Sequence, residues 1–141
     1  MSKDYLIGIW DGEPDLLEFK VFGYECRAER HDTMGHWCGY IQVGALHPWH
    51  ALNYDDVDVD VHGGLTFSEN GWFGFDCAHA GDLVPKMHAL TGGHYLGETY
   101  RDLGFVVGQL IELAKQAYKA EGYGVQDTVC SGEDSQDGQD R

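Results

Sequence analysis

The dipeptide Asn70-Gly71 constrains the fold of this chain more than any other feature. It lies between two stretches in which apolar and polar residues alternate. Asn-Gly is the preferred pair for a type I′ turn, the tightest connection between two antiparallel strands. Residues 55–82 are therefore predicted to form a β-hairpin.

The length of the hairpin loop sets the register of the two strands. A two-residue loop places Glu69 opposite Trp72, and therefore His62 opposite His79. A four-residue loop places His62 opposite Cys77 instead. Both registers put the same side chains on the same face, because they differ by an even number of residues.

The two faces of the predicted hairpin differ in character. The face predicted to pack on the core carries Val57, Val59, Val61, Leu65, Phe67, Trp72, Asp76 and Ala78. The opposite face carries Asp56, Asp58, Asp60, His62, Thr66, Phe73, Phe75, Cys77 and His79. Asp76 lies on the apolar face, where an ionised carboxylate needs hydrogen-bond partners such as loop amides. This partition predicts a polar site on the second face.

Short apolar stretches bounded by turn residues predict three further strands, at 3–10, 19–30 and 36–43. Residues 44–54 are predicted to be a loop, since they contain a proline that interrupts a strand ladder. Glycine-rich residues 80–98 are predicted to form a long connection.

One long helix is predicted from Tyr100 to Glu121. Its apolar stripe comprises Leu103, Val106, Val107, Leu110, Leu113, Ala114 and Ala117. Thr99 is the predicted N-cap, with Asp102 completing a variant of the capping box, and Gly122 suits the left-handed position that ends a helix. Two glycines four residues apart, at 104 and 108, suggest a close approach to the sheet. The fold class is therefore α+β, a small mainly antiparallel sheet with this helix packed across one face.

Length and composition are those of one globular domain, expected over residues 1–124. Residues 125–141 are acidic and nearly free of apolar side chains, so we expect a disordered tail. The N-terminus lacks the pattern of a signal peptide and no stretch is long enough to span a bilayer, which predicts a cytoplasmic protein. In a reducing compartment the four cysteines are expected to be free thiols.

The charge of the chain is strongly negative, at −15, and only −4 of this comes from residues 127–141. Nucleic-acid binding relies on lysine and arginine to neutralise phosphates, so direct binding to nucleic acid is excluded. An acidic body permits a basic partner, because opposite charges speed encounter. Solubility alone is the simpler explanation of the charge.

Several strings resemble a family of small uncharacterised proteins from bacteriophages and bacterial genomes. They are Gly39-Tyr40, His47-Pro48, Tyr54-Asp55-Asp56, Asp58–Gly64, Leu65-Thr66-Phe67, Gly74–Asp82 and Tyr100-Arg101-Asp102. The resemblance covers residues 36–115. It implies a phage or prophage setting, in the host cytoplasm, and no particular mechanism.

His62, Cys77 and His79 are residue types that bind zinc, and one face of a hairpin brings them close enough to share an ion. Asp60 adds a carboxylate, and His36 with Cys38 can contribute from a neighbouring strand. The alternative is a cysteine packed as a small hydrophobe beside two hydrogen-bonded histidines.

A metal-free alternative uses Cys77 as a nucleophile, with His62 or His79 as the base. Asp76 and Asp82 would then orient a histidine. The run of acids at 56, 58 and 60 is explained by a solvated strand edge, a basic partner or a cation. No EF-hand, Walker or dinucleotide-binding motif is present.

Trp49 and Tyr54, in the loop HPWHALNY, are candidate interface anchors or stacking surfaces. Two functions follow from these observations. The first is a non-catalytic phage-type accessory protein that engages a host protein or a small signal molecule, anti-defence activity being one version. The second is a small metal-dependent hydrolase with a His/Cys/Asp site on the hairpin.

Overall fold

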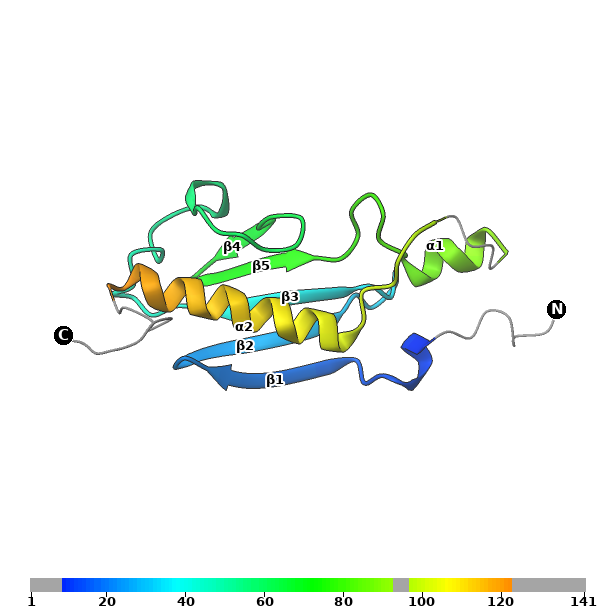
Figure 1. Ribbon diagram of the computed structural model, residues 1–141, viewed down its shortest axis with the longest axis horizontal. Helices are drawn as coiled ribbons and strands as arrows, with labels where there is room; N and C mark the ends of the chain where they lie inside the picture. Colours follow the sequence, from blue (N-terminus) through cyan, green and yellow to red (C-terminus); the bar gives the residue numbers. More distant parts are fainter. Residues whose placement is uncertain (1–8, 93–96, 123–141) are drawn as a thin grey trace, which may run out of the picture.

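The computed structural model describes residues 9–92 and 97–122, which form a five-stranded sheet with one long helix across it (Figure 1). The strands are β1 (Leu16–Val21), β2 (Tyr24–Arg30), β3 (Trp37–Gln42), β4 (Phe67–Glu69) and β5 (Trp72–Asp76). Their order is β1-β2-β3-β5-β4, and every neighbouring pair is antiparallel. Helix α2 (Leu103–Ala120) packs on β2 and β3. The predicted α+β class is confirmed.

The remaining elements are short. They are the 3₁₀ turns η2 (Ile9–Gly12) and η3 (Tyr54–Asp56) and the helix α1 (Pro85–Leu90). Helix α1 lies inside the stretch predicted as a connection. The predicted strand at 3–10 lies mostly outside the described residues, and its last two residues belong to η2. Within the described ranges, no helix is both long enough and apolar enough to cross a bilayer.

Two tight turns with positive φ at both central residues organise the sheet. Asn70 (φ 54°) and Gly71 (φ 85°) join β4 to β5, and Glu69 pairs with Trp72 as the two-residue loop requires. The four-residue alternative is therefore wrong. Phe22 (φ 54°) and Gly23 (φ 84°) form a second turn inside the stretch predicted as one strand, 19–30, which is instead the β1–β2 hairpin.

The core face of β5 is the one carrying Phe73, Phe75 and Cys77, each only 1% exposed. The predicted assignment of faces is therefore wrong for this strand, and Trp72 lies on the open side of the sheet. The neighbouring strand decides the face, since Phe75 pairs with Gly39 of β3 and its ring occupies the place of the missing side chain. A Cβ at Gly39 would lie 2.5 Å from that ring.

Residues 57–65 do not pair as a strand, contrary to prediction, and pairing begins with the Thr66 amide, which donates to the Gly74 carbonyl at 2.8 Å. Part of this segment lies in extended form along α2, where two glutamines replace the missing strand partner. The Gln116 side chain accepts from the Asp60 amide and donates to the Asp60 carbonyl, both at 2.8 Å. Gln109 Oε1 accepts from the His62 amide at 2.8 Å. Val61 is buried while Asp60 is exposed. The predicted alternation of buried and exposed side chains is therefore present, although this segment is not part of the sheet.

Helix α2 begins later than predicted, because Thr99 is held in an extended bridge to Asp82. Asp102 is the N-cap, and its Oδ1 accepts from the Phe105 amide at 2.9 Å. The predicted end is confirmed by Gly122 at φ +93°. Gly108 faces open space, so the expected close approach to the sheet is wrong. The buried stripe is Val106, Leu110, Leu113, Ala114 and Ala117.

A partly buried polar cluster, here called the Glu13 hub, fixes the start of α2. It comprises Glu13, Arg30, Trp37 and Tyr100. The Glu13 carboxylate accepts from the Leu103 amide at 2.7 Å, from Tyr100 OH at 2.6 Å and from Trp37 Nε1 at 3.1 Å. The first residue of the helix is thereby tied to the segment that precedes β1.

Candidate metal centre

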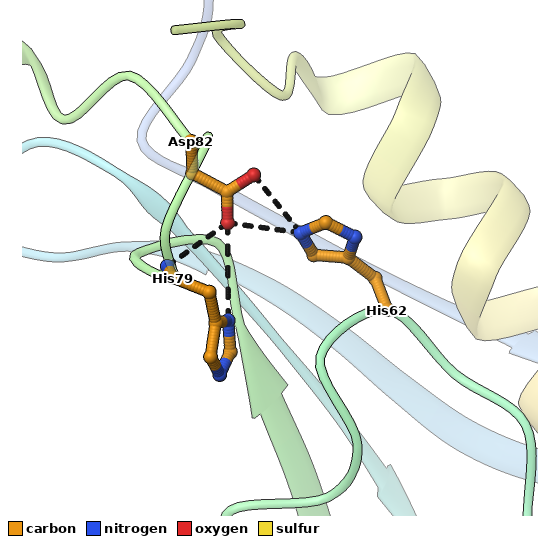
Figure 2. Close-up of side chains that lie close together, drawn as sticks. All are labelled: His62, His79 and Asp82. Carbon is orange, nitrogen blue, oxygen red and sulfur yellow. Dashed lines mark hydrogen bonds and ion pairs between the residues drawn. The ribbon is translucent and has the colours of Figure 1, made fainter.

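His62, His79 and Asp82 meet beyond the end of β5, beside the start of α2 (Figure 2). One potential ligand atom from each lies within 4.8 Å of the other two. His62 comes from the segment that Gln109 and Gln116 hold on the helix. His79 and Asp82 come from the loop between β5 and α1, so two distant parts of the sequence build the site.

Glycines allow the two loops to lie against each other. Gly63, at φ +69°, follows His62 directly, and a Cβ there would lie 2.3 Å from Cε1 of His79. Any side chain at this position would displace the imidazole. On the other loop, the Asp82 amide donates to the His79 carbonyl at 2.9 Å, which closes a tight turn through Gly81 at φ +92°.

Asp82 is the centre of the cluster, and its side chain is only 1% exposed. His62 Nε2 lies 3.0 and 2.9 Å from its two oxygens, the His79 amide donates to Oδ2 at 3.0 Å, and Arg101 Nε donates to Oδ1 at 2.9 Å. Burial by itself raises the pKa of this carboxyl, but hydrogen bonds from Arg101, His62 and the amide outweigh it and lower the pKa overall. The group is ionised at neutral pH.

The Nδ1 atom of His79 is buried, yet it makes no hydrogen bond to any residue that the structure describes. Two carboxylate oxygens face it, Asp76 Oδ1 at 3.4 Å and Asp82 Oδ2 at 3.8 Å. Buried polar atoms without a partner are uncommon in folded proteins and point to a bound water or ion. This atom, with a carboxylate oxygen on either side of it, is therefore a candidate ligand atom for a bound cation.

Cys77 does not join the cluster, and Asp82 stands where the sequence suggested the thiol. The Cys77 side chain faces the core. Burial, together with the nearby Asp82 and Cys38 side chains, raises the pKa of this thiol to about 12. A protonated, buried thiol is a poor nucleophile. The described cysteines, Cys26, Cys38 and Cys77, are free thiols, while Cys130 and the predicted tail lie outside the described residues.

The other predicted site residues have separate places. Asp76 accepts from the Ala78 amide at 3.1 Å, which is the loop-amide role expected of it. Asp60 contributes its backbone to the Gln116 contact and does not belong to the cluster. Trp49 is buried against Phe73, with ring centroids 5.9 Å apart. Tyr54 is 39% exposed.

Two further residues lie near the centre. From the sequence alone, Arg101 had no predicted role, and His36 was predicted only as an additional metal ligand. Arg101 was named only within a string, although its position just before the helix N-cap places it beside Asp82. His36 Nδ1 is a second buried atom without a hydrogen bond in the described structure. Burial and the nearby His31 lower the pKa of His36, while Asp76 and Asp82 act in the opposite direction.

The residues of this centre come from three separate strings of the sequence. One contains His62 and Gly63, the second contains His79 and Asp82, and the third contains Arg101. Comparisons of the chain with protein-family models, with curated proteins and with solved structures found no match. The function proposed below therefore rests on the geometry and chemistry of the centre.

Proposed function

We propose that this protein is a metal-dependent hydrolase that holds a divalent transition metal, zinc by its donor set, with His62, His79 and Asp82. The observation that carries the proposal is the buried His79 Nδ1, which has no hydrogen-bond partner within the described ranges and faces two carboxylates. Two imidazoles and one carboxylate form a ligand set of catalytic zinc sites, in which a fourth position stays open.

The residues fit such an ion in three respects. The donor atoms are already within 4.8 Å of one another, and the Asp82 carboxyl is ionised. His62 Nε2 contacts Asp82, and a metal would replace the proton shared there, as metals do when they bind imidazole. Arg101 holds Oδ1 of Asp82 from outside, which is the kind of contact that orients a carboxylate ligand.

The ion would lower the pKa of a bound water and so supply a nucleophile at neutral pH. The chain supplies access and a proton acceptor. The side chains of His62 and His79 are 19% and 34% exposed, so the centre is open to solvent on one side. Asp76, whose Oδ1 lies 3.4 Å from His79 Nδ1, is assigned as the carboxylate that receives a proton.

Elemental analysis of protein purified without an affinity tag tests this function. We expect about one equivalent of zinc, manganese or iron per chain, and loss of that metal in His62→Ala and His79→Ala. His88→Ala is the matched control, because His88 lies in α1 and contacts Trp10 instead of the centre. Protein that is free of metal and does not bind added zinc would contradict the proposal.

A second function, the non-catalytic accessory protein, is favoured by one observation on the open face of the sheet. A pocket of about 260 Å³ there is lined by Arg27, Glu29, Tyr40, Phe67, Glu69, Asn70 and Trp72. Partly exposed aromatic side chains beside an arginine are typical anchors of protein interfaces. A host protein bound here in the cytoplasm fits the phage resemblance, and a defence protein is one such target.

Affinity capture from a bacterial lysate distinguishes this function from the first. Wild-type protein should retain a partner that Trp72→Ala does not retain, while His79→Ala retains it normally. Equal capture by both variants, or capture that depends on His79 alone, would contradict a role for the open face.

A further inference from the structure

We propose that Arg101 binds an oxyanion of the substrate, a phosphate or carboxylate group, at the metal centre. This inference rests on the proposed function and names the substrate class for the same site. Arg101 lies next to the cluster without belonging to the ligand set, and part of its guanidinium group remains unused.

The guanidinium is held in position by two contacts. Its Nε donates to Asp82 Oδ1 at 2.9 Å, and its central carbon lies 5.1 Å from the centroid of the Phe105 ring. The same Phe105 ring meets the His62 imidazole edge-on, with centroids 5.1 Å apart. Arg101 and the proposed ligand His62 therefore both contact the Phe105 ring and the Asp82 carboxylate.

The remaining donors of Arg101 are available for a ligand. Its Nη atoms make no hydrogen bond to any described residue, and the side chain is 30% exposed. Arg30 provides the contrast, because it is only 11% exposed and its Nη atoms are bonded to Tyr100 OH and to backbone carbonyls. A fixed, planar fork with free N–H groups is the geometry that proteins use for phosphate and carboxylate.

The charge balance of the centre also selects an anion. A divalent ion together with Arg101 exceeds the charge of Asp76 and Asp82 by one unit, so the loaded centre is locally positive. The whole chain carries −15 and repels anions at long range. Beyond about 10 Å that repulsion is screened at moderate ionic strength, so a small anion responds to the local charge.

Cobalt(II), which fits the same donors as zinc and has a visible spectrum, allows a direct measurement. Cobalt-loaded protein is titrated with inorganic phosphate and, separately, with acetate. We expect a spectral change with wild-type protein, and binding about 10- to 100-fold weaker in Arg101→Gln, as for loss of a charged hydrogen bond. Arg101→Lys should be intermediate. Lys20→Gln, which removes a positive charge from β1, should match wild type.

The outcomes separate the two proposals. Cobalt binding with no response to either anion, or with equal anion affinity in wild type and Arg101→Gln, overturns the role of Arg101 and leaves the metal centre standing. Absence of cobalt binding in wild type overturns both. A response to phosphate alone identifies a phosphate-bearing substrate, and a comparable response to acetate widens the class to carboxylates.

Discussion

Two polar clusters flank the start of α2, and they differ in how completely their hydrogen bonds are made. In the Glu13 hub, the carboxylate accepts from an amide, an indole and a phenol, and Arg30 donates from all three of its nitrogens. In the candidate metal centre, Asp82 also accepts several hydrogen bonds, but His79 Nδ1 is buried without a hydrogen-bond partner among the described residues.

Exposure follows the same division. Glu13 and Arg30 are 16% and 11% exposed, whereas His79 is 34% exposed. A fully satisfied polar network makes a fold more rigid and more specific, while an incomplete one has room for a ligand. The hub therefore explains how α2 is placed, and the centre is where a function is expected.

The clusters are linked through residues 100–103. Glu13 holds Tyr100 and Leu103, and Asp82 holds Arg101, which lies between them. The hub thus fixes the backbone from which Arg101 reaches the centre. Residues held by the two clusters therefore lie next to each other in one short stretch before and at the start of α2.

The largest predicted effect is that of Glu13→Ala on stability. Removal of this carboxylate leaves Leu103 N, Tyr100 OH and Trp37 Nε1 without this acceptor. It also removes one of the two carboxylates beside Arg30, the other being that of the exposed Asp15. We expect a loss of about 3–5 kcal/mol in the free energy of unfolding, measured by urea denaturation. Glu18→Ala, which removes an exposed carboxylate of β1, is the control and should lose less than about 1 kcal/mol.

The hub also predicts how stability changes with pH. Burial by itself raises the pKa of Glu13, but hydrogen bonds from Leu103, Tyr100 and Trp37, with the charge of Arg30, lower it below the ordinary value of 4.5. The ionised form is therefore favoured by folding. Its contribution is complete above pH 4.5 and is lost as the pH falls through the lower value of the folded state. Glu13→Gln should flatten this acid limb, and an unchanged limb would contradict the assignment.

The second effect is stabilisation of the folded protein by zinc. We expect zinc to bind at the candidate metal centre and not at the Glu13 hub. Zinc at 100 times its Kd is expected to add about 2.7 kcal/mol, seen as a rise in Tm by calorimetry. His79→Ala should abolish the rise while changing the stability of the metal-free protein little, because Nδ1 has no hydrogen bond to lose in the described structure. An equal rise in His79→Ala would show that zinc binds elsewhere.

Periodicity and turn chemistry were enough to predict the turn at Asn70-Gly71 and the stripe of α2. They left two registers open, and the structure has the one that pairs Glu69 with Trp72. They could not predict which face of β5 is buried, because alternation gives a period without a direction. The Phe75 face is chosen by Gly39 of β3, a contact between residues far apart in sequence. Alternation also could not separate a strand from an extended segment bound by Gln109 and Gln116, since both have a period of two.

The centre was predicted in part for a reason that does not hold. One of the two registers considered placed His62 opposite His79. Their rings do lie close, with centroids 5.9 Å apart, although no strand reaches either residue. Cys77 was included because of the incorrect face. Arg101 could not be assigned to the centre, because its contact with Asp82 accompanies a backbone bridge between Asp82 and Thr99 that periodicity does not predict.

The third effect concerns the support of His62 and should be smaller. Gln116→Ala removes two hydrogen bonds to the backbone of Asp60, and we expect a loss of about 1–2 kcal/mol in stability with faster amide exchange near residue 60. Zinc affinity should fall about tenfold, because the segment that carries His62 loses an anchor. Glu112→Ala, one turn earlier on the helix, is the control. Unchanged exchange at Asp60 would show that the glutamine contact does not hold the segment.

The smallest predicted effect is that of Cys77→Ala on zinc binding, where we expect none. The thiol is 1% exposed and faces the core, and its pKa is raised to about 12, so it lies apart from the imidazoles and stays protonated. The substitution should cost about 1 kcal/mol of stability, as for loss of one buried heavy atom. Native protein at pH 8 should likewise resist alkylation at Cys77, because both burial and the scarcity of thiolate oppose the reaction. His79→Ala is the contrasting variant, since it should lose zinc with little change in stability. If Cys77→Ala loses zinc while Asp82→Asn keeps it, then the thiol is a ligand and the carboxylate belongs to a structural cluster like the Glu13 hub.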